Sequence, residues 1–301
     1  MSEAISKTSE QDRAPKWDSQ KFWKAQDYQQ SARLHLQHWL WEYQLDYTIH
    51  PKIDISKDSR TRVADIACGN GAWMLDLARQ YPKAILEGFD ITAAHFPAAG
   101  FLPENIKFHV WDVFTDVPAD FIEAFDVIHL RTLYSLVKGN NVGPILENAR
   151  KMLKPGGYIQ WDETDSSTMR CTLPPGLVSA PATQTLVTFF NVFSASPQSN
   201  LLGDWLHDLG TTLKESGMTV LAQEKVPPNK LMHRVWCDNF LTVWEHVIPS
   251  MPEQSFPLPP GLRLPEHMNR EVFVDLWQKA AEECQNGAWI NADQIVIVAK
   301  S

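Results

Sequence analysis

The sequence predicts an α/β fold built on a mostly parallel sheet of seven strands, with helices on both faces. Short apolar runs alternate with helical patterns between residues 60 and 165. The first run ends in a glycine-rich turn, Cys68-Gly69-Asn70-Gly71, directly before a helical segment. Two later apolar runs, 218–222 and 294–299, bring the expected strands to seven.

The first five strands are expected in the amino-terminal half of the chain, over 62–67, 85–90, 106–110, 125–130 and 158–161. Apolar residues at helical spacing predict helices over about 73–81 and 142–153. The turn Lys154-Pro155-Gly156-Gly157 ends the second of these helices and leads into the fifth strand. Strands joined by helices in this way form βαβ units, so these strands should run parallel.

The other segments predict a cap and a lid on this core. Residues 1–16 are polar and lack periodicity, which predicts a disordered tail. We expect one domain over 17–301, because no low-complexity linker divides it. Its expected parts are an N-terminal helical cap at 17–50, a core at 60–165, and lid insertions at 165–200 and 228–290. Helical patterns in the later segments lie near 186–193, 201–216, 235–247 and 265–284.

The amino-acid composition limits the classes of partner that the protein is expected to bind. The net charge of −9, without a cluster of lysine or arginine, argues against nucleic acid. The four cysteines are scattered and form no CxxC pair, so we expect reduced thiols and no metal site. No apolar run approaches the roughly 20 residues of a membrane helix, and the N-terminus has no signal-like segment. We therefore expect a cytoplasmic protein with no membrane partner; the pattern leaves its oligomeric state open.

The strongest functional signal is the turn from Asp65 to Gly71 and the acidic residues that follow it. Glycines allow the backbone to approach a ligand closely. Asp90 ends the second strand, where a carboxylate is suited to the two hydroxyls of a ribose. Asp112 ends the third strand, where it can accept from an exocyclic amine such as that of adenine. The carboxyl ends of parallel strands share one edge of a sheet, so these groups should line one site.

A nicotinamide-dependent oxidoreductase is the main alternative that uses such a turn. Its G-x-G-x-x-G pattern requires a third glycine, which allows close packing of helix and strand. Here the turn continues as Gly69-Asn70-Gly71-Ala72-Trp73-Met74, so the third glycine is missing. The sequence therefore disfavours NAD(P).

These residues, with the turn at 153–157, resemble the class I methyltransferases that use S-adenosyl-L-methionine and have a Rossmann-like sheet. A narrower likeness, over 31–38, 88–91 and 158–163, is to fungal secondary-metabolite methyltransferases, especially those that N- or S-methylate gliotoxin-type compounds. The sequence departs from the usual methyltransferase loop at Ala67, which stands in place of its first glycine.

The resemblance implies that residues 60–165 form the cofactor-binding core. Asp65 and the backbone from Ala67 through Gly69 to Gly71 would hold the methionine part. Asp90 would bind the ribose, and Ile91 would pack on adenine. The remaining implied contacts are Asp112 and the Val113 amide at the adenine edge, and Arg33 of the cap facing the cofactor carboxylate.

Methyl transfer to a thiol or amine needs mainly alignment, whereas a hydroxyl acceptor also needs a base. Asp162, Glu163 and Tyr134 follow the predicted strands and are the candidate catalytic residues. His129 is either a packed strand histidine or a cofactor contact. The predicted function is methyl transfer to a small-molecule acceptor; a regulator that binds S-adenosylmethionine without methylating remains the alternative. Aromatic residues in the insertions suit an apolar pocket wall, although a helix–helix core is the commoner reason for such a pattern: Phe189, Phe190, Phe193, Trp236, Phe240 and Trp244.

Overall fold

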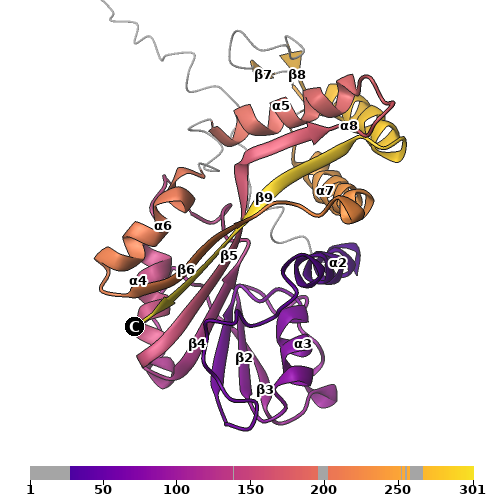
Figure 1. The fold of residues 1–301 in the computed structure, drawn as a ribbon. Helices are drawn as coiled ribbons and strands as arrows, with labels where there is room; N and C mark the ends of the chain where they lie inside the picture. The colour runs from indigo at the N-terminus through magenta and orange to yellow at the C-terminus, as the bar shows by residue number, and fades with distance from the viewer. Residues whose placement is uncertain (1–27, 138, 196–202, 252, 255, 258–266) are drawn as a thin grey trace, which may run out of the picture.

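The computed structural model describes residues 28–301 except 138, 196–202, 252, 255 and 258–266. The predicted tail at 1–16 therefore lies outside the described residues, as do residues 17–27 of the predicted cap. The chain forms a seven-stranded sheet with helices on both sides (Figure 1), which confirms the predicted fold class. None of the helices in these ranges is long and apolar enough to cross a membrane.

The strands lie in the order β3-β2-β1-β4-β5-β9-β6. The pairs β1–β2, β2–β3, β1–β4 and β4–β5 are parallel, and β9 is antiparallel to both of its neighbours. The bounds are β1 Arg62–Ile66, β2 Ile85–Asp90, β3 Ile106–Val110, β4 Phe125–Arg131, β5 Leu153–Thr172, β6 Thr219–Val226 and β9 Trp289–Lys300. A separate small hairpin joins β7 Phe256–Pro257 to β8 His267–Met268.

The helices cover both faces of this sheet and extend beyond one end of it. Helices α2 and α3 lie on one face, and α4 and α6 lie on the other (Figure 1). Helices α5, α7 and α8 surround the far ends of β5 and β9. Their bounds are α2 Tyr28–Leu45, α3 Ala72–Gln80, α4 Gly143–Met152, α5 Pro181–Ala195, α6 Asp204–Glu215, α7 His233–Val247 and α8 Arg270–Gln285.

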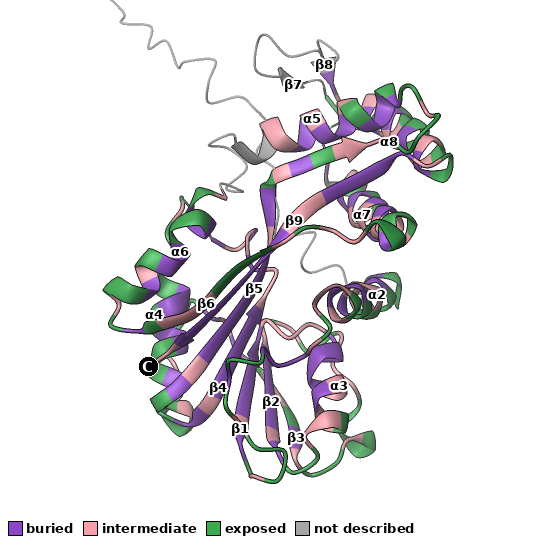
Figure 2. Ribbon diagram, in the orientation of Figure 1, coloured by how far each residue is buried: buried purple, intermediate pink, exposed green. Residues whose placement is uncertain are grey.

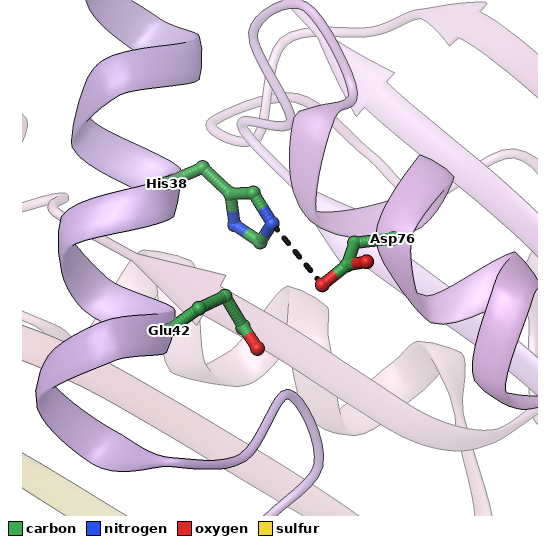
Figure 3. Close-up of side chains that lie close together, drawn as sticks. All are labelled: His38, Glu42 and Asp76. Atoms are coloured by element: carbon green, nitrogen blue, oxygen red, sulfur yellow. Dashed lines mark ion pairs between the residues drawn. The ribbon is translucent and has the colours of Figure 1, made fainter.

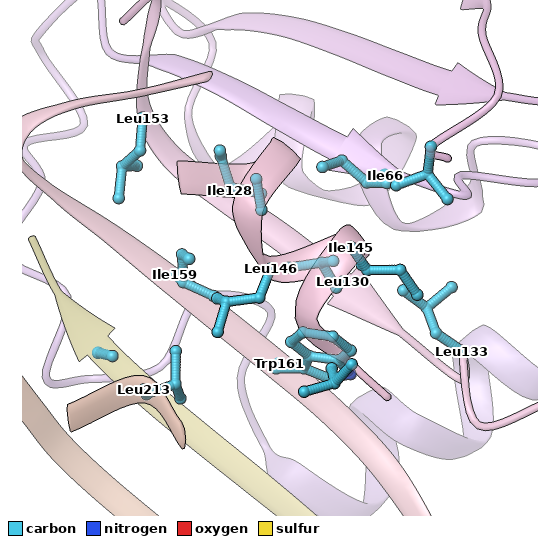
Figure 4. Close-up of a cluster of buried hydrophobic side chains, with 14 of the residues drawn as sticks. Ile66, Ile128, Leu130, Leu133, Ile145, Leu146, Leu153, Ile159, Trp161 and Leu213 are labelled. Carbon is cyan, nitrogen blue, oxygen red and sulfur yellow. The ribbon is translucent and has the colours of Figure 1, made fainter. Parts of the chain in front are cut away.

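Alternation along the strands separates two cores. In β4, Ile128 and Leu130 face α4 and α6, whereas Val127 packs with the α3 residues Met74 and Leu77. The strands are therefore buried on both faces, as parallel strands covered by helices must be (Figure 2). Figure 4 shows part of the larger cluster, in which side chains of α4 and α6 pack onto the sheet.

A third core makes the lid. The strands β5 and β9 run on past the sheet as a two-stranded ribbon, paired as far as Thr172 and Trp289. Apolar side chains of α5, α7 and α8 pack together over this ribbon. The predicted fifth strand, 158–161, is far shorter than β5, because its polar continuation gives no apolar run to recognise. The Pro155-Gly156-Gly157 turn also falls within β5, where the pairing with β4 is irregular.

We expect Leu213→Ala to lower the free energy of unfolding by about 2–5 kcal/mol, the range for a truncated core leucine. Leu213 is fully buried where α6 packs on the sheet. Leu231→Ala is the matched control, because that side chain is 78% exposed and should change stability little. Urea denaturation measures both; equal effects would contradict the packing described here.

Candidate functional site

A cavity of about 600 Å³ lies where the carboxyl ends of β1–β4 meet helix α2 and the lid. Ligands bind at this edge of open parallel sheets. Five of the predicted residues do not line it: Asp65, Gly71, His129, Asp162 and Glu163. Eight of them do: Arg33, Ala67, Gly69, Asp90, Ile91, Asp112, Val113 and Tyr134.

The turn after β1 brings its backbone to the cavity wall at Ala67 and Gly69. Ala67 has a φ of 59°, in the left-handed region that disfavours a residue with a Cβ by about 1–2 kcal/mol. The alanine is therefore held there by its surroundings. Gly71 has a different role, because a Cβ on it would collide with the ring of Phe108. This glycine allows the loop to pack against β3 and does not reach the cavity.

Two carboxylates present acceptor oxygens along the ends of β2 and β3. Asp90 accepts from the backbone N–H of Gly69 at 2.9 Å and of Thr92 at 3.3 Å, which fixes its rotamer beside the loop. Burial raises the pKa of Asp90, and those two donors oppose the rise. Asp112 accepts from the Phe114 N–H at 3.0 Å. Both carboxylates line the cavity, so their remaining lone pairs can accept from a bound ligand.

Arg33 supplies a buried positive charge from α2. Its guanidinium donates to the side-chain oxygens of Gln30 at 2.7 Å and Gln37 at 2.6 Å. Burial lowers its pKa to about 10, so it remains a cation at neutral pH. Within the described ranges no carboxylate pairs with Arg33, although it lines the cavity. A buried cation facing a cavity is suited to bind an anionic ligand group.

Beneath the cavity, His129 of β4 lies between two carboxylates. Its Nδ1 is 2.7 Å from Asp65 Oδ1 and its Nε2 is 3.1 Å from Asp162 Oδ2. All three side chains are almost fully buried, and the ring stacks on Trp73 at 3.8 Å. Burial acts to lower the pKa of His129, but Asp65 and Asp162 outweigh it and raise that pKa. The imidazolium of β4 thus links the neighbouring strands β1 and β5 through their two carboxylates.

Arg131 completes the charge balance of this network. It is half-buried, its charge interacts with the same carboxylates, and its Nη2 donates to His38 Nδ1 at 3.1 Å. Two cations, His129 and Arg131, then face two anions, Asp65 and Asp162. Near-neutrality is what allows charges to be buried at tolerable cost.

The three candidate catalytic residues lie in different surroundings. Asp162 is 1% exposed and accepts from His129 and from Gln160 Nε2 at 3.0 Å. Glu163 is fully buried on the opposite face and accepts from the backbone N–H of Leu133 at 2.7 Å. Burial raises the pKa of Glu163 to about 8. Tyr134 alone of the three lines the cavity, and burial raises its pKa to about 12, so its phenol stays protonated.

A histidine and two carboxylates between α2 and α3 have the composition of a metal site (Figure 3). Ligand atoms of His38, Glu42 and Asp76 lie within 4.8 Å of one another. Arg131 donates to Nδ1 of His38, so the neutral ring carries its proton on Nε2, which faces Asp76 Oδ2 at 3.6 Å. Burial lowers the pKa of His38 to about 3, so the ring is neutral. A metal would have to displace that Nε2 proton, and this favours a hydrogen-bonding role for the cluster.

Several cavity residues in the lid were not predicted from the sequence. Asn239 of α7 and Asn291 and Gln294 of β9 line the cavity and are at least nine-tenths buried. Each carries a buried side-chain oxygen with no partner among the described residues. An isolated amide in an apolar segment is the only signal that could have marked them. Of the predicted lid aromatics, Phe190, Trp236, Phe240 and Trp244 line the cavity, Phe189 is buried in the lid core, and the side chain of Phe193 lies outside the described residues.

Comparison with known proteins identifies the core. Residues 63–157 match the methyltransferase domain family. The chain is 33% identical over 155 residues to the methyltransferase grgD of a Penicillium species, covering 48% of this chain and 53% of that one. It is 26% identical over 136 residues to the N-methyltransferase gliN of Aspergillus fumigatus, covering 45% and 47%. A third likeness, 30% over 135 residues, is to the secondary metabolism regulator laeA of Coprinopsis cinerea, covering 43% and 32%.

The chain thus spans about half, or less, of the length of these relatives. Over that part it carries a methyltransferase domain and resembles fungal secondary-metabolite methyltransferases, as predicted. These matches agree with the predicted enzyme class over residues 63–157, while the activity of the chain and its cofactor, S-adenosylmethionine, stay predictions.

His129→Gln should destabilise the protein by about 3–5 kcal/mol, because it leaves two buried carboxylates without their cation. The contribution of a group with a raised folded pKa is complete below its unfolded value, about 6.5 for histidine, and is lost as pH rises through the folded value. The wild-type protein should therefore lose stability above about pH 6.5, and the variant should lose less over the same range. Urea denaturation at a series of pH values tests this; parallel profiles would contradict a charged His129.

Glu163→Gln should make the free energy of unfolding depend less on pH, over a pH range that begins below the one given for His129. The folded pKa of about 8 exceeds the usual value near 4.5, so the contribution of Glu163 declines as pH rises from about 4.5 to 8. Glutamine keeps an acceptor for the Leu133 N–H but does not titrate. The same denaturation series measures the effect, with Glu147→Gln as a control at an exposed site. An unchanged slope in the Glu163 variant would show that the buried carboxyl does not titrate there.

Proposed function

We propose that this chain, whose residues 63–157 form a methyltransferase domain, transfers a methyl group from S-adenosylmethionine to a small-molecule acceptor. The acceptor atom is a sulfur, nitrogen or oxygen, and the proposed setting is secondary metabolism, by likeness to grgD and gliN. The observation that carries the proposal is a continuous cavity that joins the charged strand ends to an aromatic lid. We expect neither nucleic acid nor membrane as a partner.

The residues at the strand ends fit this cofactor. Arg33, a buried cation without a carboxylate partner in the described chain, suits the carboxylate of the methionine part. Asp90 suits the ribose hydroxyls, and Asp112 with the Val113 backbone suits the adenine edge. Asn148 of α4 donates to the Val113 carbonyl at 2.7 Å and so fixes that loop. Ile91 is 51% exposed beside them and offers an apolar surface for the base.

The cofactor supplies a methyl group already activated on a sulfonium sulfur, so the protein has mainly to align the acceptor with it. Asp65 and His129 support this role from below by holding the first loop in place. Asp162 completes that support, and Glu163 holds the backbone at Leu133, beside the cavity. We therefore propose that the carboxyl groups of Asp162 and Glu163 position the site and do not remove the proton of the acceptor.

A second candidate is a regulator that binds S-adenosylmethionine without methylating a metabolite. The likeness to laeA, a secondary metabolism regulator, favours it. The part of the cavity in the lid favours the enzyme instead. A regulator that acts only by binding its cofactor needs no space for an acceptor beside the cofactor. Conversion of S-adenosylmethionine to S-adenosylhomocysteine on addition of candidate acceptors distinguishes the two.

Asp90→Ala should weaken the binding of S-adenosylhomocysteine at least tenfold, because hydrogen bonds to a charged acceptor contribute about 1.5–3 kcal/mol each. Asp120→Ala, at an exposed position away from the cavity, is the control. Titration calorimetry measures the cofactor affinity, and circular dichroism checks the fold. Native-like Asp90→Ala protein that binds as the wild type does would refute the ribose contact, and NADH binding of similar strength would refute the cofactor assignment.

A further inference from the structure

The lid part of the cavity differs in charge from the strand-end part. The charged or titratable side chains that line the cavity come from α2 and from the segments after β2–β4, namely Arg33, Asp90, His95, Asp112, Arg131 and Tyr134. Among the described residues, α5, α7 and the far parts of β5 and β9 contribute no charged or titratable side chain to it. A charged acceptor would be desolvated there without a counter-ion, which is unfavourable for a buried ion.

The same walls carry carboxamide side chains, in addition to the hydroxyl groups of Thr164 and Ser166. Asn239 lies on α7, and Gln294 lies on β9, so two carboxamides reach the cavity from different elements. Their side-chain oxygens are buried and have no partner in the described chain. Buried polar atoms are normally paired, and an unpaired one is a group that a ligand can satisfy. A carboxamide both donates and accepts, and a rotation of the amide group offers either end to the cavity.

Indole and phenyl groups surround these amides. Trp236 and Trp244 line the cavity, and their Nε1 atoms also have no partner among the described residues. Phe190 and Phe240 add ring faces beside Trp244, with centroids 5.6 Å and 6.0 Å from it. Such walls bind flat apolar surface.

We propose that the acceptor is an uncharged, flat molecule with an amide-like group, which Asn239 and Gln294 bind through paired donor and acceptor contacts. This inference rests on the proposed function, because it assigns the substrate class of the same cavity. It also explains why polar oxygens are kept in an otherwise apolar wall. A neutral amide pairs with a carboxamide in both directions, which neither a carboxylate nor an ammonium group can do.

Three probes with a common ring test the proposal: indole-3-acetamide, indole-3-acetate and tryptamine, which are neutral, anionic and cationic at neutral pH. Binding is measured by ligand-observed NMR with S-adenosylhomocysteine saturating, so that the strand-end part is filled. Ligands of this size reach millimolar affinity in a suitable pocket. We expect the wild type to bind the acetamide at least tenfold more tightly than either charged probe.

Gln294→Met and Asn239→Leu supply the variants, since each replaces an unpaired amide with an apolar side chain of similar size. Both should weaken acetamide binding about three- to tenfold, the effect of one lost neutral hydrogen bond. Their thermal midpoints without ligand should be unchanged or higher, because a buried unpaired oxygen is removed. Gln223→Met, on β6 and outside the cavity, is the matched control and should bind as the wild type does.

The proposal is overturned if a charged probe binds as well as the acetamide, if both variants keep wild-type affinity, or if no probe binds at millimolar concentration. A separate titration with S-adenosylhomocysteine keeps this result distinct from the broader proposal. Normal cofactor binding with any of those results would reject the acceptor class alone. Failure to bind the cofactor would reject the methyltransferase function itself.

Discussion

The pairing of His129 with Asp65 and Asp162 is the interaction on which the site depends. It crosses three adjacent strands directly under the loop that lines the cavity. Two buried carboxylates side by side would repel one another, and the imidazolium between them, with Arg131 close by, converts that repulsion into attraction. The strand ends are thereby held in one plane, and the backbone of Ala67 and Gly69 is positioned from below.

The long strands β5 and β9 connect this charged floor to the apolar lid. Because both strands continue past the sheet, the lid is built on the same hydrogen-bonded ribbon that carries Asp162. Residues at one end of the ribbon therefore belong to the charge network, and residues such as Asn291 and Gln294 belong to the cavity wall. The cavity is thus lined by charged residues at one end and by uncharged residues at the other. The sheet and the lid that form these two ends are joined by continuous strands.

The sequence predicted the fold where apolar periodicity was strong and failed where polar residues continue a strand. Strands β2 and β3 have the predicted bounds, because each apolar run stops at a polar end. The extension of β5 was missed, since Asp162 to Asp165 is polar yet paired with β9. The roles of polar residues in the site were equally hard to predict from the sequence. An aspartate at a strand end looks alike in sequence whether it lines the cavity, as Asp90 does, or pairs with a buried histidine, as Asp162 does.

The burial of Asp162 and Glu163 bears on which acceptors such a site can serve. A carboxylate held by His129, or by the Leu133 N–H, cannot reach an acceptor proton without breaking that bond. The phenol of Tyr134, with a pKa near 12, is a donor at neutral pH. An acceptor in the neutral lid must then be nucleophilic without a base from the protein. A thiol that ionises to a thiolate and an unprotonated nitrogen both meet this requirement. An alcohol, which needs a base within hydrogen-bond reach, is the acceptor that this arrangement serves least well.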